Sequence, residues 1–187
     1  RDGKMYNGYE ASDAINSTGT RKNGIENIGS IVTRGIMLDF PVHMGVDYLE
    51  ADHVITPEEI DAVAKAQGVT IESGDAILFR TGWLNVFKED QDKFNAMQPG
   101  PSHEVARWAH ENEIVVMAAD NSAVEHFPLP EGMPIHQSFL RDQGGYLMEL
   151  LDLNELSADK VYEFQFVVAP LNIKRGMGSP ITPLAIC

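Results

Sequence analysis

Apolar and polar positions along this chain change their spacing several times, and the changes separate predicted strands from predicted helices. Apolar runs rich in β-branched residues, or an apolar–polar alternation, predict strands at residues 30–39, 75–81, 114–119 and 161–168. Helical spacing predicts a helix over residues 56–67 and another over residues 102–111. Strands that alternate with helices favour an α/β domain with a mixed sheet, and residues 1–187 are expected to form a single domain.

The two predicted helices have clear start and stop signals. Thr56 is followed by Pro57 and by Glu59 at the third helical position, which is the pattern of a capping box. Gly68 is expected to end that helix. Ser102 is the expected N-cap of the second helix.

Three other segments lack a regular pattern. The first thirty residues are rich in Gly, Asn, Ser and Thr and are predicted to be loop, with short helical turns at 11–15 and 24–28. Residues 127–134 contain three prolines, which exclude a regular helix or a central strand. Residues 175–180 are predicted to form a glycine-rich loop.

One stretch late in the chain places a histidine and a carboxylate in a mainly apolar run. His136 is expected to precede a short helix in which Phe139 and Leu140 could face the core, and the glycine pair at 144–145 is expected to end it. Glu149 then follows among apolar residues. Because removing a charge from water is costly, Glu149 should meet a metal ion, a cation or hydrogen-bond donors, or hold a proton.

Two charged residues follow predicted strands. Asp120 could carry chemistry at the end of its strand, or it could cap the strand end by bonding backbone amides. Arg80 could bind a substrate carboxylate bidentately, or it could neutralise a buried acid. Four other histidines are expected at the surface: His43, His53, His103 and His110. His126 follows Glu125, and a local pairing of the two is a weak signal.

Composition and charge exclude several classes of function. The chain has 28 acidic and 14 basic residues and a formal net charge of -14, which argues against nucleic acid or an anionic membrane surface as a partner. Charged residues or prolines interrupt every apolar run well short of a membrane span. The single cysteine, Cys187, excludes an internal disulfide and fits a reducing compartment, so a cytoplasmic location is expected. The motifs of serine hydrolases, P-loop proteins and dinucleotide-binding proteins are absent.

Several segments, taken in order, carry a family likeness over nearly the whole chain. They are residues 1–8 (RDGKMYNG), 31–39 (IVTRGIMLD), 45–49 (GVDYL), 79–83 (FRTGW), 119–121 (ADN), 136–149, 151–153 (LDL) and 178–186 (GSPITPLAI). Together they resemble the cyclase family of metal-dependent hydrolases, which includes kynurenine formamidase and isatin hydrolase.

The resemblance implies a swivelling β/β/α fold and hydrolysis of a cyclic or N-acyl amide, or of a lactone, with the help of zinc or manganese. His136 matches the family histidine that transfers protons or binds metal, and Glu149 matches the late metal-binding glutamate. Arg80, Trp83 and Asp120 are the candidate substrate-binding residues. The resemblance also implies a homo-oligomer, and the likeness to kynurenine formamidase would place the reaction in tryptophan catabolism.

The family motif H-x-G-T-H-x-D-x-P-x-H, which supplies most metal ligands, has no match in this sequence. We therefore expect the chain to be truncated at its N-terminus, and to bind metal weakly or be inactive when isolated. The alternative hypothesis is a metal-free family member that acts as a binding or scaffold subunit. A third reading is an acidic globular domain in which His136 and Glu149 are structural.

Overall fold

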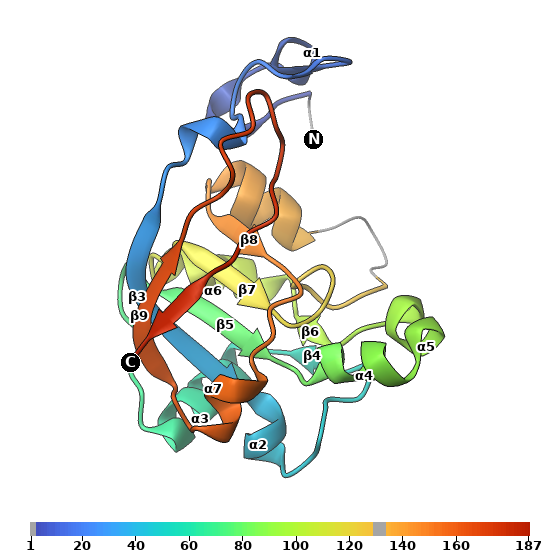
Figure 1. Cartoon of the computed structure of the whole chain (residues 1–187), viewed down its shortest axis with the longest axis vertical. Coiled ribbons are helices and arrows are strands. Elements are labelled where there is room, and N and C mark those ends of the chain that lie inside the picture. Colours follow the sequence, from blue (N-terminus) through green and yellow to red (C-terminus); the bar gives the residue numbers. More distant parts are fainter. Residues whose placement is uncertain (1–2, 129–133) are drawn as a thin grey trace.

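A six-stranded mixed sheet forms the centre of the computed structural model, which describes residues 3–128 and 134–187 (Figure 1). In spatial order its strands are β10 (Leu184–Ile186), β9 (Glu163–Val168), β3 (Ile31–Asp39), β5 (Ala76–Arg80), β7 (Val116–Ala119) and β8 (Tyr146–Met148). The strands β3, β5, β7 and β8 are parallel to one another, whereas β9 is antiparallel to β3 and β10 is antiparallel to β9. The prediction of an α/β fold with a mixed sheet is confirmed.

The burial of each strand explains its sequence pattern. All residues of β5 and β7 are buried, because helices or loops cover both faces of the sheet there, and both strands therefore appear as continuous apolar runs. In β9 only alternate residues are buried, which gives the period of two seen in the sequence. All four predicted strands are therefore present.

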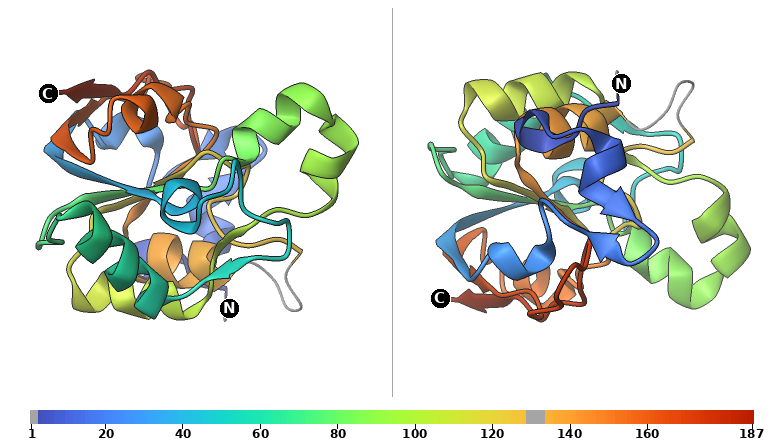
Figure 2. Two further views of the ribbon diagram at one scale, coloured as in Figure 1. Left: turned by 90° about the horizontal axis from the view of Figure 1, so that it is seen from below. Right: turned by 90° about the horizontal axis from the view of Figure 1, so that it is seen from above.

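Helices cover the two faces of the sheet unequally (Figure 2). One face carries α3 (Pro57–Gln67), α6 (Glu104–Glu111) and the π-helix η3 (His136–Asp142), and the other carries α7 (Asn154–Ala158). The larger core lies under the first group and includes Phe40, Ile60, Phe79, Val105, Trp108 and Phe139. The smaller core includes Met37, Leu78, Met148, Leu153, Phe164 and Phe166.

The helix α3 begins and ends as its sequence predicts. The hydroxyl of Thr56 accepts a hydrogen bond from the amide of Glu59, and the Glu59 carboxylate accepts one from the amide of Thr56. Gly68 ends the helix with a positive φ of 72°. The prediction that Ser102 caps α6 is wrong, because its side chain makes no cap bond and its amide donates to the carbonyl of Ile55.

The π-helix differs from its prediction in two respects. His136 is the first residue of η3 rather than a residue before it, and Phe139 is buried while Leu140 is 40% exposed. The side chains of adjacent helical residues diverge around the axis, and here Phe139 is the one that faces the core. The helix ends at Asp142, shortly before the predicted glycine pair, and Gly144 has a positive φ of 76°.

Short elements make up most of the remaining structure. They are η1 (Tyr6–Gly8), α1 (Ala11–Ala14), β1 (Ile15–Asn16), β2 (Gly19–Thr20), η2 (Ile25–Asn27), α2 (Phe40–Met44), β4 (Val54–Ile55), α4 (Trp83–Glu89), α5 (Gln91–Ala96) and β6 (Gly100–Pro101). The N-terminal elements lie at one end of the molecule against the loop predicted near residue 175, where the amide of Thr20 donates to the carbonyl of Arg175 (Figure 1). Of the proline-rich segment, residues 129–133 lie outside the described residues. Each helix in the described part of the chain is too short or too polar to cross a bilayer.

Candidate active site

The structure brings three charged side chains together at His136. His136 opens η3, Glu149 follows the last residue of β8, and Glu125 lies in the loop after β7. The Nδ1 atom of His136 lies 2.6 Å from Oε1 of Glu125, and its Nε2 atom lies 3.6 Å from Oε1 of Glu149. The imidazole ring therefore lies between two carboxylates, one at each nitrogen.

The two carboxylates differ strongly in burial. The expectation that Glu149 is removed from water is wrong, because its side chain is 37% exposed. The strand β8 ends at Met148, and the chain then turns outward through Leu150, which has a positive φ and is itself exposed. The buried carboxylate of the cluster is Glu125, which has no exposed surface.

Glu125 satisfies its charge with donors from the start of η3. Its two carboxylate oxygens accept hydrogen bonds from the backbone amides of Ile135, at 2.9 Å, and of His136, at 3.3 Å. The sequence suggested Glu125 only as a neighbour of His126, but its carboxylate pairs with His136 instead. The only sequence feature that could have indicated a role for Glu125 was its position a few residues after a buried strand. That position does not identify His136, eleven residues later, as its partner.

The charges around His136 shift its protonation. The hydrogen bond to Glu125, and after it the nearby carboxylate of Glu149, raises the pKa of His136 to about 9, while partial burial of the ring acts in the opposite direction. The metal-free ring therefore carries a positive charge at neutral pH.

Arg80 neutralises a buried acid, which is the second of its two predicted roles. Its Nη1 atom donates to Oδ1 of Asp39 at 2.8 Å, and its Nη2 atom donates to Asn154 at 3.2 Å. Asp39 also accepts a hydrogen bond from the hydroxyl of Ser157. These contacts join the carboxyl ends of β3 and β5 to α7.

Asp120 is likewise engaged within the fold. Its carboxylate accepts hydrogen bonds from the amide and hydroxyl of Thr81 and from the amide of Gly82. Burial raises the pKa of Asp120 to about 6, although these bonds and the charge of Arg80 act against that rise. Asp120 thus bonds the backbone of the neighbouring strand end rather than the amides that follow it.

Trp83 lies in a small aromatic core. Its ring is fully buried between Tyr48 and Phe94, and its Nε1 atom donates to the carbonyl of Phe94 at 3.3 Å. Substrate contacts from Arg80, Trp83 or Asp120 remain a prediction, and the burial and bonding of these side chains weigh against it.

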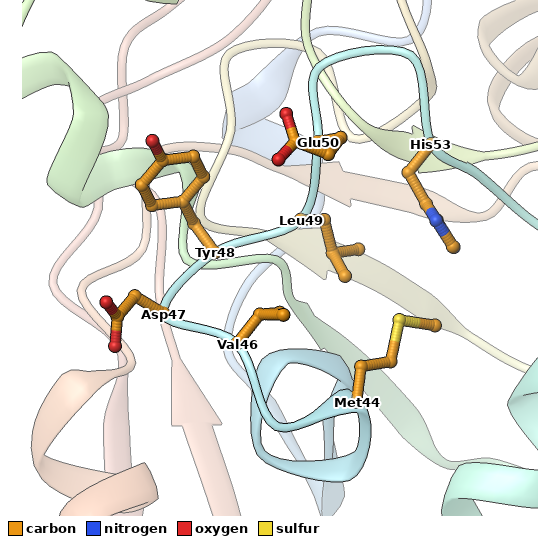
Figure 3. A pocket seen from close by; sticks show the side chains of 7 residues that line it. All are labelled: Met44, Val46, Asp47, Tyr48, Leu49, Glu50 and His53. Atoms are coloured by element: carbon orange, nitrogen blue, oxygen red, sulfur yellow. The ribbon is translucent and has the colours of Figure 1, made fainter.

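An open pocket of about 400 Å³ lies between the end of α2 and the loop that leads to β4. Figure 3 shows its lining side chains, which are Met44, Val46, Asp47, Tyr48, Leu49, Glu50 and His53. The lining does not include Glu125, His136 or Glu149, so this pocket is a separate surface feature.

The residues around His136 fit part of a metal site. Nε2 of His136 and Oε1 of Glu149 face each other, and both atoms belong to groups that bind zinc or manganese. A structural or catalytic zinc takes at least three protein ligands. Among residues 3–128 and 134–187, no three His, Cys, Asp or Glu side chains are arranged to hold a metal ion. Among the described residues, the pair of His136 and Glu149 alone is therefore too small to hold such an ion.

Comparison with known proteins identifies the family. Residues 12–126 match the family model described as "Putative cyclase", which is more than half of the chain. The chain belongs to the cyclase family. It is 27% identical to an isatin hydrolase from Roseibium aggregatum over 145 residues, which are 73% of this chain and 54% of that protein. The family likeness of the sequence is confirmed.

Solved structures share the fold. A crystal structure described as a novel cyclase superposes with a TM-score of 0.89 at 30% identity, over 99% of this chain and 64% of that one. Isatin hydrolase A from Ralstonia solanacearum superposes with a TM-score of 0.68 at 22% identity, over 87% of this chain and 64% of that one. The cyclase-family fold is thus confirmed, and the chain spans about half the length of the curated relative it matches.

The buried pair of Arg80 and Asp39 predicts a specific stability loss. Substitution Arg80→Met should lower the free energy of unfolding by about 3–5 kcal/mol, because it leaves the Asp39 carboxylate buried without its cation. Adding Asp39→Asn should recover part of that loss in urea unfolding. Arg107→Met, at an exposed position of α6, is the control and should cost under about 0.5 kcal/mol. Additive losses in the double variant would contradict the pairing.

The raised pKa of His136 predicts a pH-dependent stability in the metal-free protein. The charged ring stabilises the folded state fully below about pH 6.5, and this contribution is lost as the pH rises through about 9. Urea unfolding should therefore show wild type losing its advantage over His136→Gln between these pH values. His110→Gln, on the exposed side of α6, is the control. A wild-type advantage that is constant with pH would refute the shift.

Proposed function

We propose that this chain carries part of the active site of a metal-dependent hydrolase that cleaves a cyclic amide, an N-acyl amide or a lactone. The observation that carries the proposal is the approach of His136 Nε2 to the Glu149 carboxylate, at positions where the sequence resembles the family's metal-binding residues. Membership of the cyclase family and the similarity to an isatin hydrolase support hydrolysis as the reaction class.

In this proposal His136 and Glu149 hold zinc or manganese through Nε2 and a carboxylate oxygen. When bound, such a metal lowers the pKa of a water molecule and polarises the scissile carbonyl. The further ligands would come from the part of the relatives' length that this chain does not span. The domain would then be the C-terminal portion of a longer protein.

His136 has a second possible role in the same reaction. If Nε2 does not bind metal, the raised pKa keeps a proton there near neutral pH, and that proton could pass to the leaving nitrogen or oxygen. The two roles use the same atom in different protonation states. Glu149 lies on the same side of the ring in both cases and would accept the hydrogen bond from a protonated Nε2.

A second candidate function is a metal-free binding or scaffold subunit. Two observations favour it. The described residues offer no third metal ligand, and the ion pair with Glu125 already balances the charge of His136. Under either function we propose a homo-oligomer in the cytoplasm with a small amide or lactone as its ligand. A place in tryptophan catabolism belongs to the same proposal.

Kinetics on the full-length protein test the enzymatic proposal. His136→Ala should lower kcat/KM for the best substrate among isatin, an N-formyl amide and a lactone by about 10²–10⁴-fold, because it removes a metal ligand or a proton donor. His103→Ala, at an exposed position beside α6, should leave kcat/KM unchanged. Wild-type rates in His136→Ala would remove His136 from the mechanism.

Metal removal separates the two candidate functions. For the hydrolase, a chelator should abolish turnover and lower the melting temperature, and zinc or manganese should restore both. The scaffold subunit predicts a melting temperature that ignores chelator and metal alike. No hydrolysis in the metal-loaded full-length protein would favour the scaffold.

A further inference from the structure

We propose that Glu125 is the positioning residue of His136, which it holds by Nδ1 so that Nε2 faces Glu149. The inference deepens the proposed function and rests on it for the use of Nε2. The orientation itself depends only on contacts within the described residues.

The carboxylate of Glu125 contacts both the backbone amide and the ring of His136. Oε1 of Glu125 lies 2.6 Å from Nδ1 of the ring and also accepts the backbone amide of His136, while Oε2 accepts the amide of Ile135. With the backbone and Nδ1 both fixed, the ring cannot rotate about its side-chain bonds without breaking a hydrogen bond. The direction of Nε2 is therefore determined by Glu125.

The contact with Glu125 also determines which ring nitrogen of His136 carries the proton. Glu125 is fully buried and bonded to two amides, so it stays an acceptor and the ring must donate from Nδ1. In the neutral ring this leaves the lone pair on Nε2. Metal-binding histidines are typically held in this way, by a carboxylate or carbonyl at the other ring nitrogen.

The loop that carries Glu125 has a strained backbone and is held by several side-chain hydrogen bonds. Val124, directly before it, is buried and has a φ of 60°, a region that β-branched residues rarely occupy. The side-chain amide of Asn121 donates to the carbonyls of Val124 and Pro99, and that of Gln98 donates to the carbonyl of Glu125. Strained backbone of this kind persists where surrounding contacts impose it, and it is concentrated at functional sites.

Close packing supports the loop from β6. A Cβ atom on Gly100 would lie 2.5 Å from the carbonyl oxygen of Val124 and 2.7 Å from the carbonyl carbon of Glu125. Both neighbours are backbone atoms and cannot move aside as a side-chain end would. Gly100→Ala should therefore displace Glu125 while leaving its carboxylate chemically intact.

Nuclear magnetic resonance of the ¹⁵N-histidine-labelled protein, treated with chelator, tests the orientation without reference to metal or catalysis. In wild type the Nδ1 atom of His136 should carry a proton with a strongly downfield resonance, assigned by its loss in His136→Asn. Glu125→Gln should shift that resonance upfield or abolish it. Glu149→Gln is the matched control, because it removes the carboxylate at the other nitrogen, and it should change Nε2 only.

A second pair of variants separates positioning from charge. Gly100→Ala should disturb the Nδ1 resonance although Glu125 is still present, whereas Gly178→Ala, where an added Cβ meets no atom within 4 Å, should not. An unprotonated Nδ1 in wild type would overturn the proposal even if every variant failed to fold. An unchanged resonance in a folded Glu125→Gln protein would overturn it as well.

Calorimetry with zinc or manganese alone extends the test to the full-length protein. Glu125→Gln should weaken metal binding about 10–100-fold. Wild-type metal affinity in Glu125→Gln would overturn the positioning role. If wild type itself binds no metal while the Nδ1 resonance behaves as expected, the orientation by Glu125 holds and the metal-dependent function fails.

Discussion

The buried charge of Glu125 is the constraint on which the candidate site depends. A carboxylate without contact to water must be surrounded by donors, and the donors here are two amides at the start of η3 and the ring of His136. To supply them, η3 must begin beside Glu125. The position of His136, and through it the approach to Glu149, follows from satisfying that one charge.

A second buried network occupies the carboxyl edge of the parallel strands, where α/β proteins commonly bind ligands. Arg80 is paired with Asp39, and Asp120 is bonded to Thr81 and the next amide, so these groups serve the junctions between β3, β5, β7 and α7. Their polarity is used within the fold. The looser pair of His136 and Glu149 lies instead at the start of η3 and just beyond the end of β8.

The chain places one histidine between two carboxylates and spans only part of the length of its relatives. The pair of His136 and Glu149 lies in a chain that spans 54% of one relative and 64% of a structure with a TM-score of 0.89. A domain can therefore hold a precise arrangement around one histidine without completing a metal centre. The contacts of Gln98, Asn121 and Gly100 that support the Glu125 loop all lie within this chain.

Local pattern in the sequence was sufficient for β3, β5, β7 and β9 and for the capped helix α3, because spacing, caps and glycine stops act over a few residues. It failed for Ser102 and Leu140, where strand contacts and core packing decided between local alternatives. Which carboxylate is buried was decided only by the tertiary structure. Glu125 and Glu149 are equally acidic in sequence, but one is enclosed by η3 and the other lies beyond the end of β8. The desolvation of a carboxylate depends on neighbours that are distant in the chain, and a local sequence pattern does not identify those neighbours.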